Sequence, residues 1–395
     1  MTVMFQDKYV FAQLTAFLNR TQFNNYVRKY DGDRYVKHFT CWNQLLAMMF
    51  GQLSNRESLR DLIVAFEAHR AKQYHLGLGR KPIAKTTFAS ANQNRDYRIF
   101  EDFAFYMMEQ ARKKRVTDVF KLKGNVYAFD STTIPLCLSI FWWAKFRKKK
   151  GGIKAHVLYD LESQVPAFFH ISTASVYDSK AMKEIPYESG SYYVFDRGYN
   201  AFKELFEIHQ HESFFVVRAK KNLQYKCCKW RRRLQKNLLT DAVIEFTEYN
   251  SYRKNQEKLR LVKFYDEEQG REFAFLTNTF HLTAPEIANL YKNRWQIELF
   301  FYEKYIVMRS ERESSPENQV DTDLLLRSTS HNDNHFLSPL SQSRRFLLDS
   351  QDLSGSRLGV RSVYAFSKAS RFAFESARAY MSVVCIETCP RISRI

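Results

Sequence analysis

The sequence predicts an α/β protein in three parts: a helical N-terminal domain, an α/β core with a mostly β insertion, and an irregular C-terminal segment. Apolar residues recur at helical spacing over about the first 115 residues, and short apolar runs typical of strands follow from Asn125. The composition then changes abruptly after Lys304. We therefore place the three parts at about residues 1–118, 119–302 and 303–395, with the insertion at about 212–280.

The N-terminal domain is predicted to be a small bundle with a polar, mostly basic exterior. Apolar groups are spaced helically in Tyr9–Leu18, and Thr40–Phe50 is densely apolar. The segment Ser54-Asn55-Arg56-Glu57 predicts a capping box, with Ser54 as the N-cap of the next helix. That helix presents one apolar face, formed by Leu59, Leu62, Ile63 and Phe66.

In the core and insertion, short apolar runs predict strands, and Ala201–His209 predicts a helix between them. The strands are expected at Val126–Asp130, Lys154–Tyr159, Pro166–Ile171, Tyr192–Asp196, Phe214–Arg218, Val243–Thr247, Leu259–Phe264 and Phe273–Leu276. Strands followed by a helix indicate an α/β core with a partly parallel sheet.

A well-marked helix closes the core. Thr283 can cap it with Glu286, Pro285 is tolerated in its first turn, and it is expected to run to about Phe301. Beyond Lys304, Ser is the commonest residue and only one Lys remains. This segment is either a Ser-rich tail or a translation out of the ancestral reading frame.

The net charge of +19 is informative about partners. Nucleic acid is the first candidate, because Lys and Arg displace the counterions of phosphates, and an anionic membrane surface is the second. No apolar run approaches the roughly 20 residues of a spanning helix, and the N-terminus lacks the pattern of a signal peptide. Six scattered cysteines fit a reducing cytoplasm.

Candidate catalytic residues come from three places. The runs VYAFD and YYVFD end in Asp130 and Asp196, where a carboxylate can point into a cleft, although Asp is also common where strands stop. Tyr291, Arg294 and Glu298 are spaced i, i+3 and i+7, which places them on one face of a helix. On its own, the Arg–Glu spacing fits a plain helix ion pair equally well.

In chain order, Asp130-Ser131-Thr132, Asp196-Arg197-Gly198-Tyr199 and Tyr291-x-x-Arg294-x-x-x-Glu298 resemble the catalytic signature of DDE transposases of the insertion-sequence four family. That family includes the transposon five transposase. The strand-rich insertion and the segments CWNQLLAMMFGQLSNRESLRDL and FWWAKFRKKKGGIKAHVLYD also match its layout. The resemblance covers about residues 1–301.

The resemblance implies an RNase H-like fold in which Asp130, Asp196 and Glu298 coordinate two Mg²⁺ ions, with Mn²⁺ as a substitute. Mg²⁺ prefers hard oxygen ligands, and two ions can stabilise the attacking and leaving oxygens of a phosphodiester displacement. Water would first nick the transposon end, and the freed 3′-hydroxyl would then join target DNA. The expected partner is double-stranded DNA, held by a homodimer at two ends in the bacterial cytoplasm, at the nucleoid.

Several residues are expected to contact DNA. By resemblance, Tyr291 and Arg294 would contact phosphates of the transposon end, and Arg197 belongs to the signature beside Asp196. The basic run of Arg147, Lys148, Lys149 and Lys150 is either a phosphate contact or a solvated turn in a loop between core strands. Trp230 lies in the basic segment KCCKWRRR and could stack on an unpaired base.

Two positions qualify the resemblance. His156 lies on a predicted strand beside the site and is left out of the metal set, because a packed or hydrogen-bonded His is the simpler explanation. The family signature continues with a Lys seven residues after the Glu, but Tyr305 stands there in this chain. The alternative to an active transposase is therefore a DNA-binding relic that has lost catalysis.

Overall fold

The computed structural model describes residues 10–54, 56, 58–79, 81–113, 119–136, 144–147, 150–230, 237–247, 257–267 and 270–301. These residues fall into two compact units. The first comprises the described residues up to Arg20 together with Asp33–Ala91, and the second comprises Thr21–Gly32 and Asn92–Phe301. The predicted irregular segment 303–395 lies outside the described residues.

The first unit is helical, as the sequence predicts. Aromatic rings fill its centre: the ring of Phe50 packs against those of Phe11 and Phe66 at centroid distances of 5.5 and 5.1 Å. Its helices are α1 (Val10–Thr15), α3 (Cys41–Leu53), α4 (Leu59–Ala68), the 3₁₀ helix η1 (Arg70–Leu76) and α5 (Lys85–Asn94), which ends in the second unit.

The prediction that Ser54 begins a helix is wrong. Ser54 is the C-cap of α3, and its hydroxyl donates a hydrogen bond to the carbonyl of Phe50, 2.6 Å away. The N-cap of α4 is Ser58, whose side chain accepts from the amide of Asp61 at 3.1 Å. The apolar run of α3 continues to Leu53, so the chain must turn before the next helix can start.

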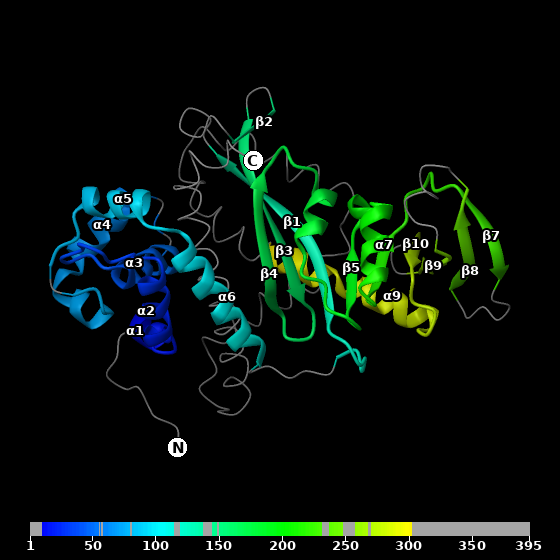
Figure 1. The fold of residues 1–395 in the computed structure, drawn as a ribbon, viewed down its shortest axis with the longest axis horizontal. Coiled ribbons are helices and arrows are strands. Elements are labelled where there is room, and N and C mark those ends of the chain that lie inside the picture. The colour runs from blue at the N-terminus through cyan, green and yellow to red at the C-terminus, as the bar shows by residue number, and fades with distance from the viewer. Residues whose placement is uncertain are drawn as a thin grey trace, which may run out of the picture. The chain divides into compact units, whose positions relative to one another are not determined.

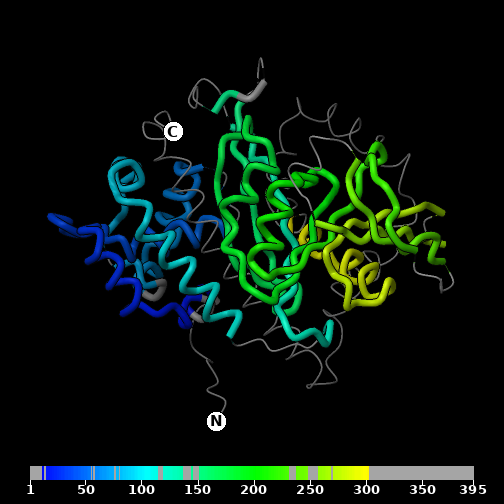
Figure 2. Tube along the Cα trace, turned by 45° about the vertical axis from the view of Figure 1, so that its right-hand side comes forward, coloured from blue at the N-terminus to red at the C-terminus, as the bar shows by residue number. Residues whose placement is uncertain are grey.

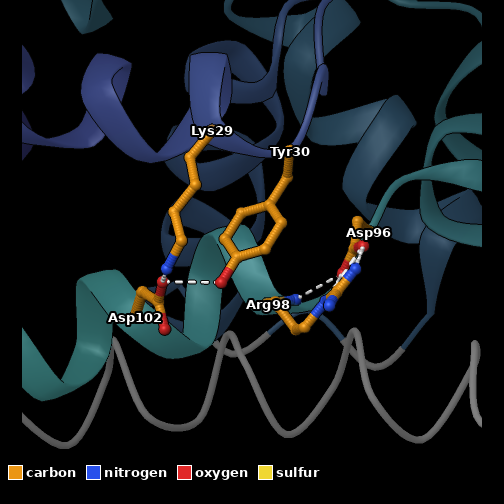
Figure 3. Close-up of polar contacts among 5 residues, drawn as sticks. All are labelled: Lys29, Tyr30, Asp96, Arg98 and Asp102. Atoms are coloured by element: carbon orange, nitrogen blue, oxygen red, sulfur yellow. Dashed lines mark hydrogen bonds and ion pairs between the residues drawn. The ribbon is translucent and has the colours of Figure 1, made fainter.

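Two helices of the second unit, α2 (Arg20–Lys29) and α6 (Arg98–Lys113), pack together. The ring of Phe23 on α2 meets that of Phe103 on α6 edge-on at 5.0 Å. Polar contacts reinforce this packing, because Asp102 accepts hydrogen bonds of 2.8 Å from Lys29 and from the hydroxyl of Tyr30 (Figure 3). In the described part of the chain, no helix has the length and apolarity needed to cross a membrane.

Helix α6 belongs with the sheet. Its Arg112 donates to the carboxylate of Asp160 at 3.2 Å and to the hydroxyl of Tyr127 at 2.5 Å, both on strands. The compact units therefore divide the chain before α6, whereas the sequence suggested a boundary near residue 118.

The described strands form one mixed sheet. Its strand order is β2-β3-β1-β5-β6-β10-β9-β8-β7, with β4 paired to β3. The strands are β1 (Val126–Leu136), β2 (Lys145–Arg147), β3 (Lys150–Asp160), β4 (Val165–Thr173), β5 (Tyr192–Phe195), β6 (Phe214–Arg218), β7 (Tyr225–Trp230), β8 (Leu238–Phe246), β9 (Leu259–Asp266) and β10 (Arg271–Thr277). Between or after them lie the short helices η3 (Asp178–Glu184) and η4 (Arg197–Tyr199) and the helices α7 (Phe202–Gln210) and α9 (Ala284–Asn293).

The core of this sheet has the layout expected of an RNase H-like fold. Strands β4, β3 and β1 are antiparallel neighbours, and β5 and β6 continue the sheet in parallel to β1. Because β6 pairs in parallel with β5, the predicted insertion strand Phe214–Arg218 is part of the core. Strands β10, β9, β8 and β7 then extend the sheet with antiparallel pairs, as the green and yellow traces of Figure 2 show.

The two faces of the core carry different helices (Figure 1). On one face, Leu205 and Ile208 of α7 pack into the buried cluster that contains Phe129 and Phe195. Successive side chains of a strand point to opposite faces, so Asp130, next to Phe129, points away from α7. That second face is covered by α9 and the helical residues after it.

Candidate active site

The structure brings Asp130 and Asp196 to the same edge of the core sheet. Phe129 of β1 lies opposite Phe195, the last residue of the parallel strand β5, and the two aspartates directly follow these two residues in the chain. The prediction that Asp130 ends its strand is wrong. Strand β1 continues to Leu136, because β3 runs beside it over this whole length.

The third carboxylate comes from the helical segment that starts at Thr283. The predicted capping box is confirmed: the amide of Thr283 donates to Glu286 Oε2 at 2.6 Å, and the amide of Glu286 donates to Thr283 Oγ1 at 3.4 Å. The predicted unbroken helix is not observed. Helix α9 ends at Asn293, Arg294 forms a turn, and residues 295–301 are helical again.

Two side chains of this segment connect the carboxylates. Nη1 of Arg294 lies 3.2 Å from Oδ2 of Asp130, and Nη2 donates to Oε1 of Glu298. The hydroxyl of Tyr291 donates to Oδ1 of Asp196 at 3.3 Å. The three predicted carboxylates, Tyr291 and Arg294 thus form one cluster, although they span more than 160 residues of the chain.

The pKa of Asp130 is affected by its burial and by the other negative charges of the cluster. Burial raises the pKa of its carboxyl to about 6, and the nearby charges of Glu298 and Asp196 add to the rise. The amide of Ser131, at 2.8 Å from Oδ1, and the guanidinium of Arg294 act in the opposite direction. One oxygen is thereby held by the backbone and the other by Arg294, which fixes the orientation of the carboxylate.

The donor chemistry of the cluster fits a hard divalent cation, since all three side chains offer carboxylate oxygens and repel one another. The spacing of these carboxylates in the structure, however, does not form a metal site. Within the described ranges, no group of three or more His, Cys, Asp or Glu side chains is placed to hold a metal ion. Between Asp130 and Glu298 lies a guanidinium, which is itself a cation.

A second polar network lies next to Asp130. Asp178 accepts a hydrogen bond from the hydroxyl of Ser131 at 2.7 Å and pairs with Lys154 at 3.0 Å. His156 is fully buried, its Nε2 lies 2.9 Å from the hydroxyl of Ser172, and burial lowers its pKa to about 4. It is packed and hydrogen-bonded, as the sequence suggested.

Arg218 is a candidate that the sequence analysis missed. It is the last residue of β6 and follows Val217, which lies opposite Phe195, so it is a direct neighbour of Asp196. Its guanidinium lies 4.9 Å from the centre of the Phe273 ring, and its buried Nε has no hydrogen-bond partner among the described residues. The sequence did contain a pattern that points to Arg218, because FFVVR is a third apolar run that ends in a charged residue.

The structure describes some of the remaining basic candidates and not others. Arg197 follows Asp196 directly in η4, and its buried Nε finds no partner within the described part of the chain. Arg147 ends β2 and is paired in register with Lys150 at the start of β3. Lys148 and Lys149 lie outside the described residues.

The structure does not bring Trp230 to the carboxylates. Trp230 ends β7, which is five strands away from β5 in the sheet order. At about 4.8 Å per strand, this corresponds to roughly 24 Å. Trp230 is 62% exposed on the outermost strand of the insertion, so any contact with DNA there would be far from the cluster.

An acidic cluster on a mixed sheet, with a basic side chain from a closing helical segment, is the arrangement that the resemblance to DDE transposases implies. Comparison with protein families agrees. Residues 121–332 match the transposase DDE domain, and residues 6–79 match a domain of unknown function. The chain belongs to the transposase DDE domain family. The match continues past residue 301, where the sequence resemblance was expected to end.

Three bacterial relatives are similar in sequence. The chain is 34% identical over 233 residues to the transposase y4zB of Sinorhizobium fredii, covering 57% of this chain and 62% of that protein. It is 28% identical to the transposase for insertion sequence element IS5377 of Geobacillus stearothermophilus, covering 44% and 45%. It is 23% identical to the transposase for insertion sequence element IS4SA of Synechocystis, covering 57% and 63%. The matches thus span less than two thirds of each relative.

Among solved structures, the piggyBac transposase synaptic complex with hairpin DNA is similar with a TM-score of 0.35 and 12% identity, over 97% of this chain and 81% of that one.

Proposed function

We propose that this chain catalyses metal-dependent cut-and-paste DNA transposition, with Asp130, Asp196 and Glu298 as its catalytic carboxylates. The observation that carries the proposal is the convergence of these side chains, from two neighbouring strands and a helix, through contacts with Arg294 and Tyr291. Membership in the transposase DDE domain family supports it.

The carboxylates would hold divalent cations, Mg²⁺ in the first place, with Mn²⁺ as a substitute and two ions in all. When bound, such ions stabilise the attacking and leaving oxygens of a phosphodiester displacement. The chain's own contribution is to orient the ligands. The amide of Ser131 holds Oδ1 of Asp130, and the hydroxyl of Tyr291 holds Oδ1 of Asp196.

Double-stranded DNA would be bound by the basic side chains around the cluster. Arg197 and Arg218 flank Asp196, and their buried Nε atoms lack partners among the described residues. A guanidinium suits this role because its planar fork donates bidentately to phosphate. Two copies of the chain would hold the two transposon ends, and the reaction would take place at the nucleoid.

The test is cleavage of duplex DNA that carries the ends of the chain's own element, in Mg²⁺ or Mn²⁺. We expect Asp130→Ala to abolish nicking while it retains DNA binding, because the basic side chains proposed to contact DNA are unchanged. Glu272→Gln, which neutralises an exposed acid on β10, serves as the control and should cleave normally. Normal cleavage by Asp130→Ala would contradict the carboxylate assignment.

A specific observation also favours a second candidate, a DNA-binding relic without catalysis. Tyr305 occupies the position of the signature Lys, and the composition changes after Lys304. Translating the encoding DNA in all frames beyond Phe301 distinguishes the two. Another frame that continues the helix with a Lys seven residues after Glu298 would identify a frameshifted product, which would bind DNA in a salt-sensitive way without strand transfer.

A further inference from the structure

Arg294 occupies an unusual place in its helix. The amide of Arg294 donates to the carbonyl of Tyr291, and the amide of Ile297 donates to the carbonyl of Arg294, both at 3.1 Å. These bonds join residues three apart, as in a 3₁₀ helix, so the helix is tightened at this residue. The side chain of Arg294 at this position is only 11% exposed and reaches Asp130 on β1.

In that position the guanidinium forms ion pairs with two of the proposed catalytic carboxylates at the same time. It pairs with Asp130 at 3.2 Å and with Glu298, and its centre lies 5.5 Å from the ring centre of Tyr291. Attraction to Glu298 and Asp130 outweighs the cost of burial and raises the pKa of Arg294 further above its ordinary value. Arg294 is therefore always charged and acts as the local counter-cation of the cluster.

The same carboxylate oxygens are those that a divalent cation would need. A cation and a guanidinium cannot share Oδ2 of Asp130 and Oε1 of Glu298 at full strength, because both are positive and both need the same lone pairs. Binding of the ion must therefore break or weaken the two contacts of Arg294. A phosphate group is the natural acceptor for the released guanidinium, since it offers the same bidentate geometry as a carboxylate.

We propose that Arg294 competes with the divalent cation for Asp130 and Glu298, and that a DNA phosphate relieves this competition by drawing the guanidinium away. The inference rests on the proposed function, because it takes the carboxylates as the metal site. This competition makes the binding of the divalent cation depend on DNA. By thermodynamic linkage, DNA must strengthen metal binding by the same factor by which the metal strengthens DNA binding.

The experiment measures Mn²⁺ affinity of the full chain without DNA, by electron paramagnetic resonance of the free ion. We expect Arg294→Gln to bind Mn²⁺ at least about tenfold more tightly than the wild type, a factor within the usual range for coupled sites. Lys292→Gln is the matched control, since it removes an exposed positive charge in the last turn of α9, two residues before Arg294, and its affinity should stay within about twofold. Equal or weaker binding by Arg294→Gln would overturn the proposal.

A second measurement does not depend on the variant's folding. The wild-type affinity for Mn²⁺ is compared with and without a duplex oligonucleotide, after correction for Mn²⁺ bound by the duplex alone. We expect the duplex to raise the affinity by a comparable factor, and an unchanged affinity would again count against the proposal.

The failure of this inference can be told apart from failure of the proposed function. Adding Asp130→Asn to Arg294→Gln should remove the gained Mn²⁺ binding. If Mn²⁺ binding depends on Asp130 but is no tighter in Arg294→Gln, only the competition is wrong. If Mn²⁺ binding is indifferent to Asp130, the carboxylates are not the metal site and both proposals fail.

Discussion

Arg260 and Asp241 form a two-pronged ion pair inside the β insertion, with both N–O distances at 2.8 Å and both side chains almost fully buried. The remaining nitrogen of Arg260, Nη1, donates to the carbonyls of Thr279 and Leu282 at 3.1 and 2.5 Å. Leu282 directly precedes the N-cap Thr283. The pair thereby joins β8 and β9 to the start of the helix that leads to the carboxylate cluster.

Asp241→Ala is expected to lower the free energy of unfolding by about 3–5 kcal/mol, because it leaves the Arg260 charge buried without its partner. Urea denaturation at pH 7 measures the change. The control Glu272→Gln alters an exposed acid of the same sheet and should change stability by less than about 0.5 kcal/mol. A loss below about 1 kcal/mol for Asp241→Ala would mean that the pair does not hold the insertion.

Thr283→Ala should cost about 1 kcal/mol, the usual value of an N-cap, because it removes the acceptor for the amide of Glu286. Thr283→Ser keeps the hydroxyl and should be nearly neutral. Thermal and urea unfolding of the two variants give the comparison. Equal losses for both would indicate that the threonine methyl group, rather than the cap, stabilises the helix.

The raised pKa of Asp130 predicts a pH-dependent cost to stability. The folded protein binds this proton up to about pH 6, whereas an unfolded Asp loses it near pH 3.8. The folded state therefore holds more protons between these values, and its stability falls as pH rises through this window, by on the order of 3 kcal/mol from this group.

Asp130→Asn removes that dependence. Measured by urea denaturation in EDTA, the variant should match the wild type near pH 4 and exceed it in stability at pH 7. A difference between the two proteins that does not change with pH would show that Asp130 titrates normally.

Arg218→Gln tests the residue that the sequence analysis missed. If Arg218 contacts a DNA phosphate, the variant should bind duplex DNA more weakly, and the slope of log affinity against log salt should decrease by about 1. Lys203→Gln removes an exposed charge from α7, on the opposite face of the sheet, and serves as the control. Identical salt slopes for Arg218→Gln and wild type would exclude the contact. Fluorescence anisotropy over a salt series is a suitable measurement.

Local patterns were sufficient for much of the fold. Apolar runs predicted β5 and β6 almost to the residue, and the capping box at Thr283 was correct in every detail. These features depend on interactions within a few residues of the chain. The errors arose where a neighbouring segment sets the bounds of an element. Strand β1 extends beyond its apolar residues because β3 pairs with it. The N-cap of α4 is Ser58 and not Ser54 because α3 extends to Leu53.

The amino-acid sequence alone selected Asp130, Asp196, Tyr291, Arg294 and Glu298 as candidates for the site, from apolar runs that lead to an Asp, helical spacing and motif order. Their mutual contacts needed the folded chain. Parallel pairing of β1 with β5 sets the two aspartates side by side, and the packing of the closing helical segment on the sheet brings Arg294 to both Asp130 and Glu298. Spacing along a helix cannot specify this arrangement, because it depends on strand register and on burial, which arise only when distant segments pack.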